Sequence, residues 1–413
     1  MTTPWLQVIG LTEQGLAALP KDDQSKIAKA ELVISPERFL DAIKSLKGFS
    51  GKAMTWPQPF MDIIPLLQEW QNRKVVICAT GDPLWFGAAS TLVRYFSPDE
   101  MAITPAASGF QWAAARMGWP LHQTRCLTVH GRPHETVLKH LAPSARLLVI
   151  AHDHDTPHRL AGLLNAAGYG EAKLTALGHI GGEHHGKNPE TCHQAMAKDW
   201  DGQSFEVPDF HILAITCPDV STGFLPLTPG LPDDAFQSDG KLTKAEVRAA
   251  TLAALKPCDG GVLWDLGCGS GAVGIEWMRA APHARAYGID NRQDRLEVAA
   301  QNAARLGTPE WQGVCADLPH GLDDLPAPDA VFIGGGLTAE LVGHVRTRLK
   351  PGGRLVVNTV TLESEAVLLS LWQQWGGDLK RIAVSRADPV GPYHGWRPLM
   401  PVTQWSLESE TWS

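Results

Sequence analysis

The chain has 413 residues, more than one ordinary hydrophobic core accommodates, so we expect at least two domains. With 44% hydrophobic and 19% charged residues it has a globular composition, and its net charge of -8 argues against a uniformly basic nucleic-acid binder. No apolar run is long enough to span a membrane, the N-terminus shows no signal-peptide pattern, and seven scattered cysteines are typical of a reducing compartment, so we expect a cytoplasmic protein without a membrane partner.

Strand-like and helix-like segments alternate along most of the chain, which predicts an α/β fold. In the first half, short apolar runs bounded by turn residues predict strands at 5–10, 74–80, 145–151 and 210–216. A Gly-Asp-Pro turn at 81–83 follows the second run. Helices are expected to begin near Ala88 and to cover 157–167, closed by Gly168.

Residues 217–239 contain four prolines together with several Gly, Asp and Ser residues, and they show no apolar periodicity. We therefore predict an interdomain linker there, between an N-terminal domain at 1–216 and a C-terminal domain at 240–413. Just after it, Thr243 and Glu246 have the spacing of a capping box. This predicts a helix that begins at Thr243 and ends near Leu255.

The C-terminal domain continues with an apolar strand, a glycine-rich loop, a helix and a second strand. Gly267, Gly269 and Gly271 let the backbone turn sharply and approach a ligand closely. Asp265 precedes the loop, and Asp290 ends the next strand, where a nucleotide site needs a carboxylate for ribose hydroxyls. The pattern indicates an adenosine-type cofactor. Further strands are expected at 330–333 and 354–358.

Two cofactor classes fit this loop. Gly267, Gly269 and Ala272 satisfy the short fingerprint of nicotinamide dinucleotide sites. The fuller pattern, Asp-x-Gly-x-Gly-x-Gly, resembles the first motif of the class I S-adenosylmethionine methyltransferases, and we favour this interpretation. The resemblance implies a Rossmann-like fold and cofactor contacts from Thr243, Asp265, Gly267, Cys268, Gly269, Ser270, Gly271, Asp290, Ala316 and Asp317.

The segment that follows the predicted strand at 330–333 narrows the chemistry. Methyltransferases of this fold that act on exocyclic amines usually carry an Asn/Asp-Pro-Pro-Tyr turn there, whereas this chain has Gly334-Gly-Gly336. The difference argues against methylation of DNA bases or glutamine. It leaves a glycine-lined floor on which a flat, bulky substrate can approach the backbone.

The first half has a different signature. Residues 80–87 (Thr-Gly-Asp-Pro-Leu-Trp-Phe-Gly) and 105–118 (Pro-Ala-Ala-Ser followed by an Ala-rich helix) resemble the tetrapyrrole methylases, which are class III S-adenosylmethionine enzymes. The resemblance implies two α/β lobes, divided near 105–110, and a second cofactor site at Gly81, Asp82, Pro83 and Ser108. The opening loop at 9–15 departs from the Gly-x-Gly-x-Gly form common in that family.

A tetrapyrrole methylase followed by a class I methyltransferase is a distinctive order, and over the whole chain it resembles the decarboxylating precorrin-6Y C5,15-methyltransferases of cobalamin biosynthesis. The resemblance implies conversion of precorrin-6Y or -6B to precorrin-8, with methylation at C5 and C15 and loss of the C12 acetate carboxyl. It also implies that the N-terminal domain acts at C5, that the C-terminal domain acts at C15 and decarboxylates, and that the protein self-associates.

Two alternatives stay open: an RNA methyltransferase with an accessory domain, and one active methyltransferase domain joined to a regulatory binding module. We expect no metal site, because the histidines at 152–155 and 184–185 lack the spacing of a closed ligand set. Near the C-terminus, Arg381, Arg386, His394 and Arg397 are candidates for binding substrate carboxylates, and a solvated basic face is the competing interpretation.

Overall fold

A computed structural model describes residues 4–182, 189–201, 206–220 and 223–408. The chain divides into two compact units, Met1–His134 with Pro143–Ser221, and Glu135–Ala142 with Thr222–Ser413. Both are α/β, as the alternating segments predict. Among the described residues, no helix has the length and apolar character needed to cross a membrane.

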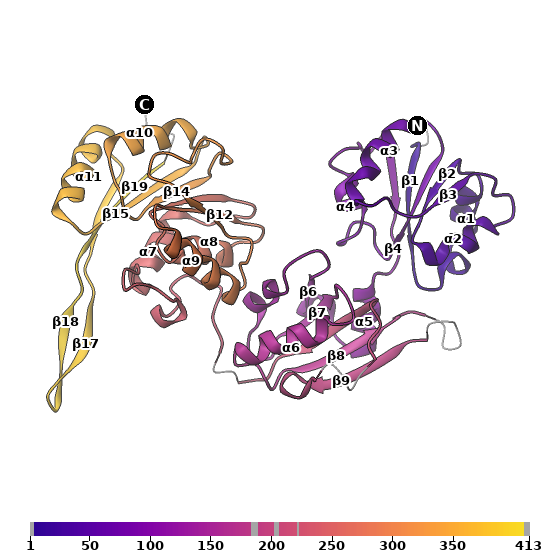
Figure 1. Ribbon diagram of the computed structural model, residues 1–413, viewed down its shortest axis with the longest axis horizontal. Coiled ribbons are helices and arrows are strands. Elements are labelled where there is room, and N and C mark those ends of the chain that lie inside the picture. Colours follow the sequence, from indigo (N-terminus) through magenta and orange to yellow (C-terminus); the bar gives the residue numbers. More distant parts are fainter. Residues whose placement is uncertain (1–3, 183–188, 202–205, 221–222, 409–413) are drawn as a thin grey trace. The chain divides into compact units, whose positions relative to one another are not determined.

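The first unit begins with a lobe built on a five-stranded, fully parallel sheet in the order β3-β2-β4-β1-β5. Helices α1 and α2 cover one face, and α3 and α4 cover the other (Figure 1). The central strands are therefore buried on both sides, which explains their nearly continuous apolar sequences. The elements are β1 (Leu6–Leu11), α1 (Lys21–Ala28), β2 (Leu32–Ile34), α2 (Glu37–Lys44), β3 (Lys52–Met54), α3 (Ile63–Glu69), β4 (Val75–Thr80), α4 (Ala89–Leu92) and β5 (Met101–Thr104).

The second lobe of this unit has a mixed sheet in the order β6-β7-β10-β8-β9, in which only β6 and β7 run parallel. Residues 105–108 connect β5 to α5, whose first turn Ser108 caps: its hydroxyl accepts a hydrogen bond from Phe110 N at 3.2 Å. The elements are α5 (Gly109–Met117), β6 (Arg125–Thr128), β7 (Arg146–Ile150), α6 (Thr156–Ala166), β8 (Lys173–Gly178), β9 (Thr191–Met196) and β10 (His211–Thr216).

The second unit contains a seven-stranded sheet in the order β13-β12-β11-β14-β15-β19-β16. Its first five strands are parallel, and β19 pairs antiparallel with both β15 and β16. Helices α7, α8 and α9 cover one face, and α10 and α11 cover the other (Figure 1). The elements are α7 (Ala245–Leu255), β11 (Val262–Leu266), α8 (Ala272–Ala280), β12 (Arg285–Asp290), α9 (Gln293–Arg305), β13 (Gln312–Cys315), β14 (Ala330–Ile333), α10 (Ala339–Arg348), β15 (Arg354–Thr359), α11 (Leu362–Trp375), β16 (Asp378–Ile382) and β19 (Val402–Glu408).

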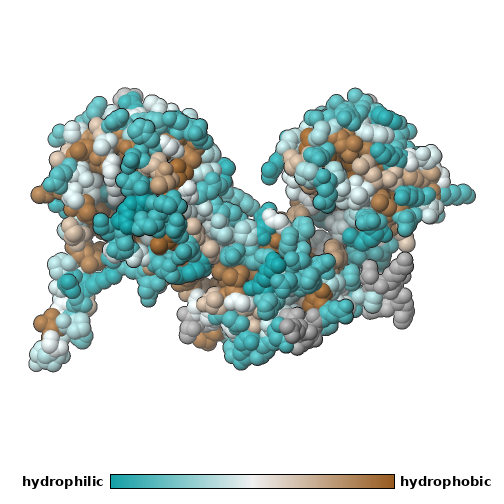
Figure 2. All heavy atoms as spheres, viewed as in Figure 1, coloured by the Kyte–Doolittle hydropathy of each residue, from teal (hydrophilic) through white to brown (hydrophobic). Residues whose placement is uncertain are grey.

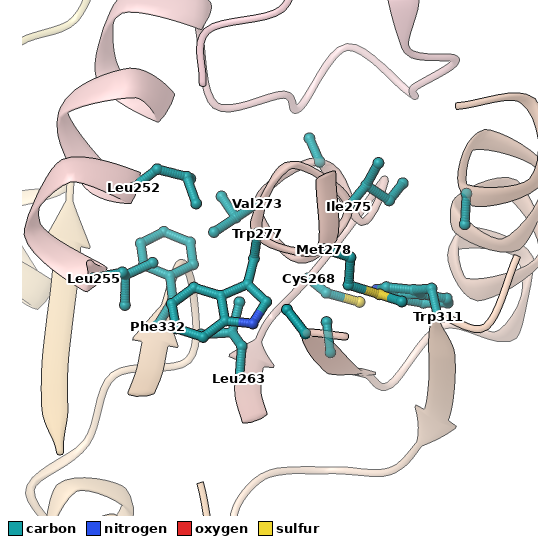
Figure 3. Close-up of a cluster of buried hydrophobic side chains, with 14 of the residues drawn as sticks. Leu252, Leu255, Leu263, Cys268, Val273, Ile275, Trp277, Met278, Trp311 and Phe332 are labelled. Atoms are coloured by element: carbon teal, nitrogen blue, oxygen red, sulfur yellow. The ribbon is translucent and has the colours of Figure 1, made fainter. Parts of the chain in front are cut away.

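A cluster of large apolar side chains holds α7 and α8 against this sheet (Figure 3). Trp277 of α8 lies beside Phe332 and Leu263 of the sheet, and Leu252 and Leu255 of α7 lie on the same side of the cluster. All five side chains are at most 2% exposed. This packing fixes the start of α8, and with it the loop that joins β11 to α8.

The beginning of α7 differs from the sequence prediction. The helix begins at Ala245 rather than Thr243, and no side chain of a capping box bonds its N-terminus. Instead the carboxylate of Asp233 accepts a hydrogen bond from Ala245 N at 2.9 Å, while Arg248 donates to the carbonyl oxygen of Thr243. The capping-box prediction was wrong because groups from 233 and 248, brought close only by the fold, bond these backbone atoms.

Strands β17 (Ser385–Val390) and β18 (Tyr393–Pro398) form a hairpin that pairs with no other described strand. Figure 2 shows hydrophobic residues among hydrophilic ones along the part of the chain that Figure 1 labels β17 and β18. The exposed side chains here include Val390, Tyr393 and Trp396. At its base, Arg386 anchors the hairpin through ion pairs with Glu246 at 2.8 Å and Asp233 at 3.1 Å.

Candidate functional sites

The glycine loop of the second unit leads from β11 into α8 through three residues with left-handed backbone angles. The φ values are +71° at Gly267, +54° at Gly269 and +76° at Gly271. A Cβ atom on Gly267 would lie 3.0 Å from the backbone nitrogen of Gly335, and one on Gly271 would lie 2.9 Å from Ala299 Cβ. Glycine is therefore required at 267 and 271 both for conformation and for space.

Backbone and side-chain hydrogen bonds hold the loop in place. The N–H groups of Gly267 and Cys268 both donate to the carbonyl oxygen of Ile289, at 2.8 and 3.1 Å. The carbonyl oxygen of Ser270 accepts a hydrogen bond from the buried Asn302 side chain at 3.1 Å. Because Ile289 belongs to β12 and Asn302 to α9, two elements besides the loop itself form the cradle.

Asp265 lies beneath this loop. Its carboxylate accepts a hydrogen bond from Gly274 N of α8 at 2.9 Å, and its other oxygen, also buried, has no partner among the described residues. The side chain is only 1% exposed, and burial raises its pKa to about 7. The structure therefore gives Asp265 a clear part in joining β11 to α8.

Asp290, at the end of β12, bonds both to the glycine loop and to the turn after β13. Its carboxylate accepts hydrogen bonds from Gly269 N and from Arg292 N, both at 3.1 Å. Its carbonyl oxygen accepts from Ala316 N at 3.2 Å, and the neighbouring Asn291 side chain donates to the Asp317 carboxylate at 3.0 Å. The loop, β12 and the turn after β13 thus meet at one edge of the sheet, as expected for the carboxyl ends of parallel strands.

The segment before α7 lies beside the same loop. The carbonyl oxygen of Lys241, two residues before Thr243, is 3.8 Å from the position that a Cβ on Gly269 would occupy. Asp239 forms an ion pair with Arg295 of α9 at 2.7 Å. Lys241, two residues before Thr243, therefore lies beside the glycine loop. Arg295 and Asn302 of α9 bond to this segment and to the loop, and the sequence reasoning missed both. Their separation of seven residues, which places them on one face of a helix, was the available signal.

The three candidate arginines near the C-terminus have acidic partners, whereas His394 is exposed. Arg386 is paired with Glu246 and Asp233, Arg397 is 3.0 Å from Asp388, and Arg381 is paired with Glu365. Arg386 therefore anchors the hairpin. This pairing makes these arginines weaker candidates for binding substrate carboxylates than their clustering in the sequence indicated.

The first unit contains a cavity of about 380 Å³ between its two lobes. Gly81, Asp82 and Ser108 line it, and Pro83 is not among the lining residues. The Gly81 N–H donates to the carbonyl oxygen of Leu11 at 2.7 Å, so the altered opening loop borders the same cavity. A Cβ atom on Gly10 would lie 2.3 Å from the carbonyl oxygen of Gly81, so the two loops can approach this closely only because residue 10 is glycine.

The histidines singled out in the sequence fall in different surroundings. His152 lines the cavity, where its Nδ1 accepts a weak hydrogen bond from Gly131 N at 3.4 Å. His154 is exposed and bonds to Asp209 at 2.8 Å, and this partner raises the pKa of the His154 imidazole. His184 and His185 lie outside the described residues.

Comparisons with known proteins cover both halves of the chain. A family model described as "Tetrapyrrole (Corrin/Porphyrin) Methylases" matches residues 15–184, and one described as "Precorrin methyltransferase domain" matches residues 234–409. A protein of Sinorhizobium sp named precorrin-6Y C(5,15)-methyltransferase [decarboxylating] is 41% identical over 408 residues, which cover 98% of this chain and 97% of that protein.

Shorter relatives match part of the chain. A Pyrobaculum aerophilum protein named probable cobalt-precorrin-6B C(15)-methyltransferase (decarboxylating) is 33% identical over 184 residues, which cover 42% of this chain and 93% of that protein. The crystal structure of a C-terminal domain of precorrin-6Y C5,15-methyltransferase from Rhodobacter capsulatus is 44% identical, covers 45% of this chain and 100% of that domain, and has a TM-score of 0.43.

Proposed function

Because the chain belongs to the family of decarboxylating precorrin-6Y C5,15-methyltransferases, we propose that it methylates a precorrin at C5 and C15 and releases the C12 acetate carboxyl as carbon dioxide. The observation that carries this proposal is the match over nearly the full length of the chain, which includes both methyltransferase regions. We further propose that each unit holds one S-adenosylmethionine.

The second unit fits such a cofactor by its own geometry. The three left-handed glycines leave the cradle without Cβ atoms, and Asp290 stands at the end of β12, where ribose hydroxyls need an acceptor. Residues that would hold the cofactor there are Gly267 to Gly271, Asp290, Thr243, and the turn with Ala316 and Asp317. Asp265 would not contact the cofactor directly; its hydrogen bond from Gly274 N would fix the position of the loop relative to α8.

The first unit offers a different kind of site. Its cavity lies between two lobes and is lined by Gly81, Asp82 and Ser108 together with several aromatic side chains. The Asp82 carboxylate accepts a hydrogen bond from Leu84 N at 2.9 Å, which holds the turn after β4. We assign the cofactor of the first unit to this turn and to the start of α5, with Pro83 shaping the turn.

The bound cofactor supplies a methyl group on a positively charged sulfur, which is already strongly electrophilic. The residues of the chain then have to align the acceptor carbon and exclude water. The glycines after β14 contribute to this in the second unit, because Gly335 and Gly336 add no bulk beside the loop. Decarboxylation needs an electron sink, and the conjugated macrocycle of the substrate provides one.

We assign C5 methylation to the first unit, and C15 methylation with decarboxylation to the second. Support for this division comes from the relatives named C(15)-methyltransferase (decarboxylating), which match about two fifths of this chain over nearly their whole length. The family model for the precorrin methyltransferase domain also matches residues 234–409 alone.

Mass spectrometry of the product tests the proposal. The full-length protein is incubated with precorrin-6Y and S-adenosylmethionine, and we expect a product that has gained two methyl groups and lost carbon dioxide. Asp82→Ala should leave the C5 methyl missing, and Asp290→Ala should leave the C15 methyl missing. No change in mass with authentic substrate would refute the function, and the reverse pattern in the two variants would refute the division of labour.

We also propose that the protein acts in the cytoplasm as a homo-oligomer and without nucleic acid. The net charge of -8 supports the last point, because phosphate backbones bind clustered cations. Light scattering during gel filtration measures the oligomeric state. A monomer at working concentration would contradict the homo-oligomer. Tight RNA binding at moderate salt would contradict the absence of a nucleic-acid partner.

A further inference from the structure

Aromatic side chains from both lobes line the cavity of the first unit. Trp85 and Phe86 follow β4, Trp112 lies on α5, and Phe210 directly precedes β10. Phe86 has a φ of +55°, a conformation that costs energy for a bulky residue, and its side chain is nevertheless 39% exposed. The ring packs edge-on against the buried Phe110, with 6.0 Å between the ring centroids, and the part of it that stays exposed is available to a ligand.

Arg132 lies over this ring. Its guanidinium carbon is 5.5 Å from the centroid of Phe86, within the range of a cation–π contact. Among the residues that the structure describes, the guanidinium of Arg132 has this ring contact and no hydrogen bond or ion pair. The loop that carries it is fastened to the cavity, because Gly131 N donates to His152 and the preceding His130 is a lining residue.

The acidic side chains that line the cavity make other contacts, and none of them forms an ion pair with Arg132. Glu13 forms an ion pair with Arg38 at 2.7 Å. Asp82 accepts a hydrogen bond from the backbone of its own turn, and Asp209 bonds to His154. Arg132 therefore lies over a ring that lines the cavity and has no ion-pair partner among the described residues.

Resting on the function proposed above, we propose that Arg132 binds a peripheral carboxylate of the tetrapyrrole at the rim of the first unit's cavity, while the Phe86 ring contacts the macrocycle. A reduced tetrapyrrole combines a broad apolar surface with acetate and propionate groups at its edge. An aromatic ring beside a guanidinium matches that combination. The planar N–H groups of arginine suit a carboxylate better than the point charge of lysine does.

The test compares Arg132→Gln with Arg94→Gln in the full-length protein. Arg94 is an exposed arginine of the same unit that does not line the cavity. In Arg132→Gln we expect the KM for precorrin in C5 methylation to rise about tenfold, the size of one charge-assisted hydrogen bond. The kcat of C5 methylation, the affinity for S-adenosylmethionine and the C15 methylation should stay within about twofold of the control.

A substrate without carboxylate charges shows whether Arg132 recognises the charge or whether its replacement merely distorts the cavity. Esterification of the precorrin carboxylates should raise the KM of the wild-type protein and remove most of the difference between wild type and Arg132→Gln. Arg132→Lys should recover only part of the affinity.

Two results would overturn the inference. One is a KM in Arg132→Gln equal to that of Arg94→Gln. The other is a difference that persists in full with the esterified substrate. Loss of C5 methylation in the wild type would instead refute the proposed function, so the two failures are distinguishable.

Discussion

Gly267→Ala is the sharpest test of the glycine loop as a cofactor cradle. A left-handed backbone conformation costs an alanine about 1–2 kcal/mol more than a glycine. That penalty alone reduces the population of the correct loop by a factor of about 5–30. The new Cβ would also lie 3.0–3.2 Å from three backbone atoms of Gly335, so the two loops must separate. We therefore expect the affinity of the second unit for S-adenosylmethionine to fall at least about tenfold.

Isothermal titration of the full-length protein with S-adenosylmethionine measures this effect. Wild type should bind two molecules per chain, and Gly267→Ala should retain one tight site. Product analysis should then show the C5 methyl but neither the C15 methyl nor decarboxylation.

Gly343→Ala is the matched control for this substitution. Gly343 lies within α10, and a Cβ atom there would meet nothing within 4 Å, so the change should stabilise the helix by up to about 1 kcal/mol. Unchanged affinity and unchanged C15 methylation in Gly267→Ala would refute the assignment of the loop.

Two further predictions concern the buried polar groups of the second unit. Arg248 and Glu276 form an ion pair at 2.6 Å and are at most 1% exposed, so Glu276→Ala should destabilise α7 and α8 by about 3–5 kcal/mol, seen as faster hydrogen exchange of their peptides. The exposed Glu297→Ala should change that exchange by no more than about 0.5 kcal/mol, and equal exchange in the two variants would contradict the argument. Burial raises the pKa of Asp265 to about 7, so the folded state holds a proton that the unfolded state releases between about pH 4 and 7. Stability should therefore fall as pH rises through this window, by at most about 1.4 kcal/mol per unit, and Asp265→Asn should lose that slope; identical slopes in thermal melts would contradict the burial argument.

Local patterns were sufficient to predict several central strands of the three larger sheets. The apolar run at 330–333 coincides with β14, and the expected strands at 74–80 and 354–358 differ from β4 and β15 by one residue. Such runs are reliable because central parallel strands are buried on both faces, so nearly every residue in them is apolar. The glycine spacing was equally informative, since only glycine adopts the left-handed angles at 267, 269 and 271 without cost.

Residues that act through partners distant in sequence were harder to predict. Asn302 holds the glycine loop from α9, 32 positions further along the chain, and no local motif marks it. The start of α7 was misplaced for the same reason, because Asp233 and Arg248 bond its first turn. The N-terminal cavity likewise combines segments from Leu11 to Ile212.

The sequence by itself determined the α/β class, the order of two methyltransferase signatures and the glycine loop, because each depends on residues that are neighbours in the chain. Only the tertiary structure decided which charged side chains bond to other parts of the protein and which do not. Asp265 is buried against α8, Asp290 bonds the loop at the end of β12, and Arg132 stands without an acidic partner among the described residues. Those differences arise from burial and from long-range pairing, which a spacing of residue types does not encode.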